Sequence, residues 1–105
     1  MANYVLVFKG GGVPETPEAQ AKVMADWGAW FAGLGPAVVD GGNPFGPSAS
    51  IAGDGTVSEG AASGLTGYAI LSADSLSAAT DMSKDCPILA DGTGAIEIYE
   101  TFDVM

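Results

Sequence analysis

The sequence contains no histidine and no arginine, and a single cysteine, Cys86, occurs among its 105 residues. The missing histidine excludes serine-type triads and histidine-based metal sites. One cysteine cannot form a disulfide within the chain. The carboxylates do not follow the spacing of a calcium-binding loop, and the glycine run at 10–12 lacks the spacing of a phosphate-binding loop. We therefore expect no metal and no cofactor.

Basic residues are equally scarce. Three lysines stand against 13 acidic residues, which gives a net charge of −10. Nucleic acid and anionic membrane surfaces are both recognised by clustered lysine and arginine, so we expect neither as a partner. The acidic balance leaves two interpretations open, a solvated surface or an attraction for cationic partners.

Long apolar runs are absent too. No segment approaches the ~20 residues of a membrane span, and residues 1–30 lack the pattern of a secretory signal. A cytoplasmic location is the default expectation. The chain has 105 residues and a hydrophobic content of 48%, which predicts one domain over residues 1–105 with a single core.

Two short segments are apolar on both sides. Residues 4–8 read Tyr-Val-Leu-Val-Phe and residues 67–71 read Gly-Tyr-Ala-Ile-Leu. Successive side chains of a strand point to opposite faces, so both faces of a sheet must be covered at these segments. We place both strands in the centre of one sheet.

Two helices are expected around these strands. Thr16 is a good N-cap with Pro17 at the first helical position, and the helix should end near Gly33 or Gly35. Its apolar stripe comprises Val23, Trp27, Trp30, Phe31 and Leu34. A shorter helix begins after Asp74 or Ser75 and stops at Pro87. Its inner face is expected to hold Leu76, Ala79, Met82 and Cys86.

The remaining segments complete the order. Residues 37–40 and 95–102 are expected to be strands, and Ile96 and Ile98 share one side of the second of these. Residues 41–47 form a loop rich in glycine and proline. Residues 48–64 suggest a hairpin arm at the sheet edge, with a turn at 53–56.

The element order β-α-β-β-α-β predicts an α+β fold of the ferredoxin-like type. In this fold two right-handed crossovers place both helices on one face of an antiparallel sheet. Two helices cannot cover the second face of the apolar central strands. A second copy of the chain can, so we expect a homodimer packed sheet to sheet.

Several segments carry a resemblance to a known family. They are residues 4–8, 24–31, 39–45 and 67–71, then Cys86-Pro87 and residues 97–100. In order and spacing they resemble the YCII-related family, also called DGPF-domain proteins. The resemblance implies a ferredoxin-like domain that pairs into a dimeric α+β barrel, and a biochemical role that is largely undefined. A His–Asp pair is suspected of catalysis in some members.

The chain departs from that pattern in two ways. It has no histidine, so the suspected pair cannot be carried over. The Asp-Gly-Pro-Phe segment is also absent, and residues 60–64 lie roughly where it would fall. The implied fold survives both departures, whereas histidine-based catalysis does not.

One acid and four other side chains form the candidate site. Asp40 ends a strand and opens a Gly-Gly-Asn loop, where it could act as a general base or simply hydrogen-bond the turn that it starts. Asn43 and Phe45 lie in that loop. Trp27 could line a pocket or belong to the core, and its indole N–H needs a partner if buried. Tyr68 could face a cleft or an interface.

Two functions follow from these residues. The first is binding of a small metabolite, such as an aromatic one, in a cleft between sheet and helix; a cofactor-independent reaction could follow there, with Asp40 as the base and Tyr68 orienting the substrate. The second is a non-catalytic interaction module that acts through the sheet face and the glycine-rich segment 42–64. The sequence leaves open whether the protein is an enzyme.

Overall fold

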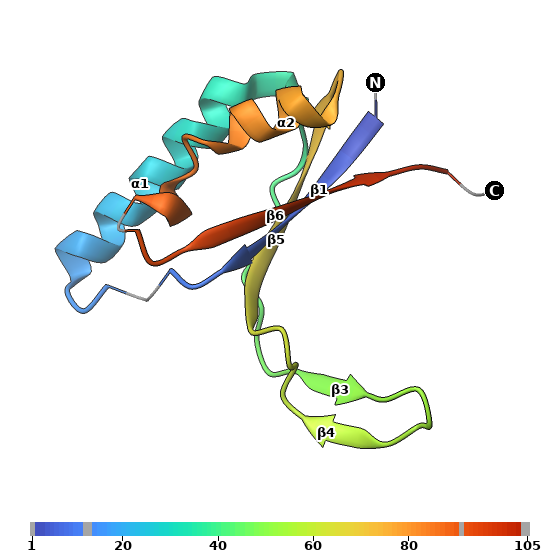
Figure 1. The fold of residues 1–105 in the computed structure, drawn as a ribbon. Coiled ribbons are helices and arrows are strands. Elements are labelled where there is room, and N and C mark those ends of the chain that lie inside the picture. The colour runs from blue at the N-terminus through green and yellow to red at the C-terminus, as the bar shows by residue number, and fades with distance from the viewer. Residues whose placement is uncertain (1, 12–13, 91, 104–105) are drawn as a thin grey trace.

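The computed structural model describes residues 2–11, 14–90 and 92–103. Its elements in chain order are the strand β1 (Ala2–Lys9), the helix α1 (Pro17–Leu34), the 3-10 turn η1 (Gly35–Ala37), the strands β2 (Val38–Asp40), β3 (Ala49–Ile51), β4 (Val57–Glu59) and β5 (Leu65–Ala73), the helix α2 (Leu76–Ser83), the 3-10 turn η2 (Pro87–Leu89) and the strand β6 (Ala95–Thr101). They form an α+β structure with a four-stranded antiparallel sheet and a separate pair of strands (Figure 1). Neither α-helix of the described chain has the length and apolar character that a membrane span requires.

The four-stranded sheet has the order β2-β5-β1-β6. Leu6 of β1 lies opposite Ala69 of β5 on one side and opposite Ile98 of β6 on the other. The two strands that are apolar on both faces therefore occupy the centre, as predicted. The short strand β2 pairs with β5 at one edge, and β6 forms the other edge.

Helix α1 begins where its sequence predicts. The hydroxyl of Thr16 accepts a hydrogen bond from the amide of Ala19 at 3.1 Å, and Pro17 opens the helix. The helix ends at Leu34, and Gly35 follows with a φ of +56°. A left-handed residue after a helix is favourable for glycine because it has no Cβ.

Both helices cover the same face of the sheet. Tyr4, Leu6 and Phe8 of β1 are buried in one cluster with Trp30 of α1 and Ala79 of α2. The β1 side chains alternate, so every second one faces this core. The core therefore lies between one face of the sheet and the two helices.

The inner face of α2 differs from the prediction at Leu76 and at Ser83. Leu76 is exposed to 49% of its surface, whereas Ala79 and Ser83 are buried. Ser83 is tolerated there because its hydroxyl donates to the carbonyl of Ala79 at 2.8 Å, which satisfies its polar atom. The helix also ends at Ser83, before Pro87 is reached.

The opposite face of the sheet carries no helix. Val5, Val7 and Ile70 are only half-buried there, and Tyr99 is 55% exposed. Val5 lies between Tyr99 and Ile70 in the pairing register, so these apolar side chains adjoin one another. We call this surface the open face; it is defined by these four residues.

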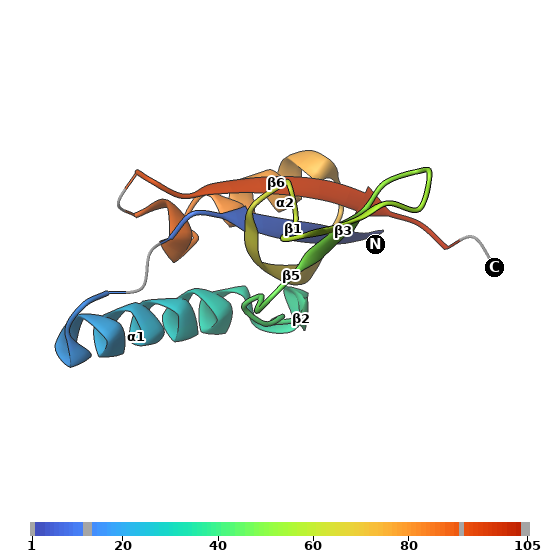
Figure 2. The ribbon, with the colours of Figure 1, turned by 90° about the horizontal axis from the view of Figure 1, so that it is seen from below.

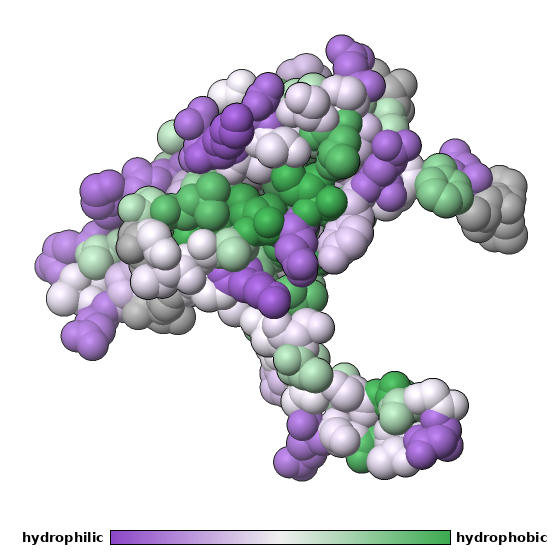
Figure 3. Space-filling model, in the orientation of Figure 1, coloured by the Kyte–Doolittle hydropathy of each residue, from purple (hydrophilic) through white to green (hydrophobic). Residues whose placement is uncertain are grey.

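Strands β3 and β4 form the predicted hairpin, which projects from the body as an arm (Figure 1) and crosses in front of the sheet in Figure 2. Figure 3 shows a wide hollow between the arm and the rest of the molecule. The hydroxyls of Ser48 and Ser50 accept hydrogen bonds from the amides of Ala61 and Ala62, at 2.9 and 3.2 Å. The arm is therefore held by polar contacts rather than by a core.

The turn of the arm also follows the prediction. The carboxylate of Asp54 accepts a hydrogen bond from the amide of Thr56 at 2.9 Å, and this bond lowers the pKa of Asp54. Ile51 and Val57 face each other across the hairpin and are 73% and 66% exposed. The arm thus presents an apolar pair that buries little surface within its own chain.

Candidate functional site

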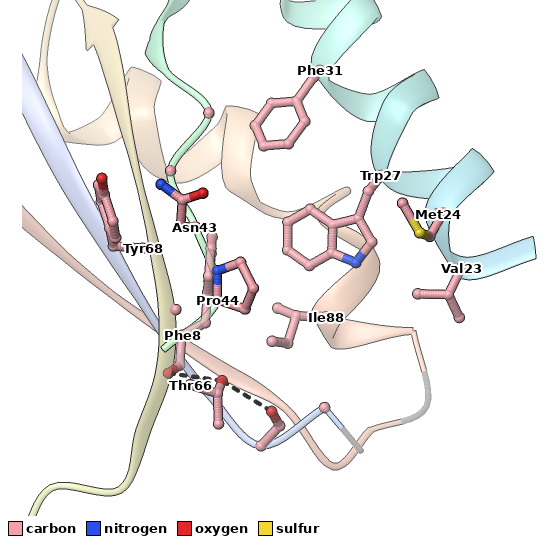
Figure 4. A pocket seen from close by; sticks show the side chains of 15 residues that line it. Phe8, Val23, Met24, Trp27, Phe31, Asn43, Pro44, Thr66, Tyr68 and Ile88 are labelled. Atoms are coloured by element: carbon pink, nitrogen blue, oxygen red, sulfur yellow. Dashed lines mark hydrogen bonds between the residues drawn. The ribbon is translucent and has the colours of Figure 1, made fainter. Parts of the chain in front are cut away.

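A cavity of about 420 Å³ lies between α1 and the end of the sheet nearest the arm (Figure 4). Its volume falls within the range of small-molecule pockets, ~300–1,000 Å³. The described residues that line it are Phe8, Gly10, Gly11, Val23, Met24, Trp27, Phe31, Gly41, Gly42, Asn43, Pro44, Thr66, Gly67, Tyr68 and Ile88.

One wall of the cavity is aromatic. Trp27 and Phe31 come from successive turns of α1, and Phe8 comes from the end of β1. The ring of Trp27 contacts Phe8 edge-on at a centroid distance of 5.3 Å, Trp30 at 5.8 Å and Phe31 at 5.9 Å. Three ring contacts of this kind hold the indole in one orientation.

The opposite wall is mainly backbone. Residues 41–44 run against β5, where Pro44 pairs with Gly67 and the amide of Phe45 donates to the carbonyl of Thr66 at 2.9 Å. Gly42 has a φ of +72°, and a Cβ there would overlap the carbonyl oxygen of Tyr68. Only glycine allows the loop to approach β5 so closely.

Two polar side chains on these walls have no partner in the described part of the chain. The indole N–H of Trp27 donates to no described acceptor, although the ring is half-buried. The Asn43 amide likewise makes no hydrogen bond with residues 2–11, 14–90 or 92–103. Thr66 differs, because its hydroxyl lies 3.2 and 3.1 Å from the carbonyl oxygens of Phe8 and Gly10. Trp27 and Asn43 are thus the groups free to contact a ligand.

The described lining carries no charged side chain. Lys22 forms an ion pair with Asp26 at 2.9 Å on the exposed side of α1, and Lys84 pairs with Asp81 at 3.1 Å on α2. Lys9 is exposed and is not in the lining. No group of three metal-ligating side chains occurs among the described residues.

The structure brings three of the five candidate residues to the cavity. Trp27 and Asn43 contribute their side chains, and Tyr68 borders it as well. The ring of Tyr68, however, lies across β5 from Trp27 (Figure 4), because it pairs with Val7 and so faces the open face. Phe45 is outside the lining and stacks on Tyr68 at a centroid distance of 5.8 Å.

Asp40 also lies outside the lining. One of its carboxylate oxygens accepts from the amide of Gly42 at 2.8 Å, and the other is 3.4 Å from the hydroxyl of Tyr68. The first contact closes the turn that Asp40 starts, which is the structural role weighed in the sequence analysis. The second is long for an O–H···O hydrogen bond. The Asp40 carboxylate and the Tyr68 hydroxyl meet outside the cavity, although Tyr68 borders it.

Two other residues are buried, as the apolar patterns of the two helices predict. Trp30 is 8% exposed, and its indole donates to the carbonyl of Met82 at 3.1 Å, so it is a core residue. Cys86 is 2% exposed, and burial raises the pKa of its thiol to about 11. A thiol with so high a pKa is a poor nucleophile near neutral pH.

Sequence reasoning missed part of the lining. Ile88 belongs to η2, and its side chain would collide with a Cβ built on Gly11. No periodicity marks a single isoleucine after a proline, so nothing in the sequence indicates this contact. Phe8 was expected only as a strand residue, although its position near the end of β1 places it in the cavity lining.

Comparisons of the chain with protein-family models, with curated proteins and with solved structures find no match. The resemblance to the YCII-related family therefore stays a hypothesis that depends on the segments quoted for it.

Proposed function

We propose that the protein binds a small molecule in the cavity between α1 and the sheet. The observation that carries this proposal is the cavity itself, of about 420 Å³, with an aromatic wall and two free polar side chains. Apolar walls with a few well-placed polar groups are typical of ligand sites. We assign the chain a ferredoxin-like fold of the dimeric α+β barrel kind, in line with the strand order β2-β5-β1-β6 and the YCII-related resemblance.

The proposal is for binding rather than for a reaction. The described lining residues include no carboxylate, amine or thiol, and a general base must lie within hydrogen-bond reach of the proton it takes. Asp40 as a base would have to act on a molecule at the sheet edge instead. Replacing Asp40 with asparagine should therefore leave ligand affinity in the cavity unchanged.

Two matched variants test the binding site. Val23 lines the cavity from the rim of α1 and is 37% exposed, so Val23→Phe narrows the cavity with little strain on the core. Ala25→Phe adds a similar ring to an exposed position of α1 outside the lining. A fragment library is screened by ligand-observed NMR against the native protein and both variants.

The expected result is a set of fragments that bind the native protein and Ala25→Phe but not Val23→Phe. Native mass spectrometry of freshly purified protein should also be run, since a copurified molecule would identify the ligand class directly. A library without hits, or hits that bind Val23→Phe as well as the native protein, would refute the cavity as the binding site.

A second function is favoured by a separate observation. The open face and the arm both expose apolar side chains, including Tyr99, Ile51 and Val57. We propose a homodimer in which the open faces of two copies meet, because a second copy offers the same apolar surface in return. A monodisperse monomer in sedimentation velocity at micromolar concentration would contradict this.

A further inference from the structure

We infer that the cavity selects an uncharged, planar ring compound that carries a hydrogen-bond acceptor. The inference depends on the proposed function, since it names the ligand class of the same cavity. It is drawn from three properties of the described lining: its lack of charge, the fixed orientation of Trp27 and the position of Asn43.

The lack of charge bears first on anions. An anion that leaves water needs a cation or several donors inside the cavity. The lysines are not in the lining, and two of them are already paired with Asp26 and Asp81. The chain as a whole carries a net charge of −10, which adds repulsion at longer range. An anionic ligand is therefore selected against.

A cation is disfavoured for a different reason. Aromatic rings attract cations through their faces, whereas their edges carry partial positive charge. The N–H at the edge of Trp27 has no described acceptor, and no carboxylate lies in the described lining to neutralise a cation. The acidic surface can attract cations to the protein, but nothing described in the cavity holds one.

The shape of the walls favours a flat ligand. On the α1 side stand the rings of Trp27 and Phe31, and on the other side the chain at 41–44 runs alongside β5, with Phe8 next to Pro44 (Figure 4). The loop is fixed to β5 by the Pro44–Gly67 pairing and by the Phe45 amide. A slot between two fixed walls can bind a planar ring while the protein loses little conformational entropy.

The acceptor is specified by Trp27. Its indole has only a donor to offer, and its three ring neighbours hold that donor in place. Figure 4 shows the Trp27 nitrogen on the side of the ring toward Val23, and the Asn43 amide on the facing loop. Asn43 can either donate or accept, so it fits more than one ligand group. A ring carbonyl or ring ether oxygen can accept from the Trp27 donor, and Asn43 can contact another part of the ligand.

Four related probes test the inference by calorimetry: coumarin, naphthalene, coumarin-3-carboxylate and N-methylquinolinium. Coumarin is a flat, neutral lactone, and naphthalene has a similar outline without an acceptor. The last two add a negative and a positive charge. Coumarin should bind more tightly than naphthalene by about 3- to 10-fold, the worth of one net hydrogen bond, and more tightly than either ion by over about 10-fold.

Trp27→Phe isolates the donor, since it keeps an aromatic ring and removes the N–H. It should reduce the affinity for coumarin by about 3- to 10-fold and leave that for naphthalene within about 2-fold. Binding of either ion as tight as coumarin would overturn the selection for neutral ligands. Equal affinity for coumarin and naphthalene, or no effect of Trp27→Phe on coumarin, would overturn the acceptor requirement.

The failure of this inference can be told apart from that of the proposed function. Library hits that Val23→Phe abolishes, but that are all charged, would refute the ligand class and keep the binding site. Probes that bind Val23→Phe and the native protein equally would refute both.

Discussion

Replacing Gly42 with alanine should detach the loop that forms one wall of the cavity. Gly42 has a φ of +72°, and a Cβ there would overlap the carbonyl oxygen of Tyr68. The positive φ alone costs an L-residue about 1–2 kcal/mol. The overlap is with backbone, which cannot rotate away, so the loop itself must move.

The movement would break two hydrogen bonds. The Gly42 amide donates to Asp40 at 2.8 Å, and the Phe45 amide donates to Thr66 at 2.9 Å. Each bond contributes about 0.5–1.5 kcal/mol. Together with the backbone strain, Gly42→Ala should lower the free energy of unfolding by about 2–5 kcal/mol.

The control is Gly60→Ala in the arm. Gly60 has a φ of +79°, but no described atom lies within 4 Å of its added Cβ. Gly60→Ala should therefore lower the free energy of unfolding only through the positive φ, by about 1–2 kcal/mol. Urea unfolding followed by circular dichroism measures both variants. Equal losses for Gly42→Ala and Gly60→Ala would refute the argument that the loop is held by close approach to β5.

Three further predictions concern stability and titration. Gly28→Ala should raise the free energy of unfolding by up to about 1 kcal/mol, because Gly28 lies inside α1 with no described atom within 4 Å of a Cβ; a lower urea midpoint would contradict this. Burial raises the pKa of Cys86 to about 11, so the native protein should resist a thiol reagent at pH 8 while the urea-unfolded chain reacts at once. Burial, followed by the nearby Glu100 carboxylate, raises the pKa of Tyr4 above its usual 10.0. The folded state therefore favours the neutral phenol, stability should decline as the pH rises above 10, and absorbance at 295 nm should show one tyrosine ionising later than the others.

The central sheet could be read from the sequence because its signals are local and strong. Residues 4–8 and 67–71 are apolar on both sides, and they became the two central strands. Thr16 and Pro17 likewise mark the start of α1 within one turn of chain. Asp54 defines the turn of the arm through a hydrogen bond that spans only two residues.

The site was less predictable because it depends on contacts between distant segments. Strand alternation puts Tyr68 and Ala69 on opposite faces of β5, but which of them faces the helices becomes known only when the helices pack. Ile88 reaches the cavity through a 3-10 turn that no periodicity marks. Ser83 can be buried on α2 because its hydroxyl donates to the carbonyl of Ala79 within the helix. The polarity of serine alone does not predict this burial.

The position of β1 in the sheet has a consequence for how the chain folds. Leu6 of β1 pairs with Ala69 of β5 on one side and with Ile98 of β6 on the other. The central strand is therefore separated from both of its neighbours by most of the sequence. Contacts so far apart close long loops and slow folding. During synthesis, residues 4–8 leave the ribosome long before β5 and β6 have been made. Their apolar side chains therefore stay exposed to solvent until these strands are available. In pulse-labelled hydrogen exchange during refolding, the amides of β1 should gain protection together with those of β5 and β6 and not earlier.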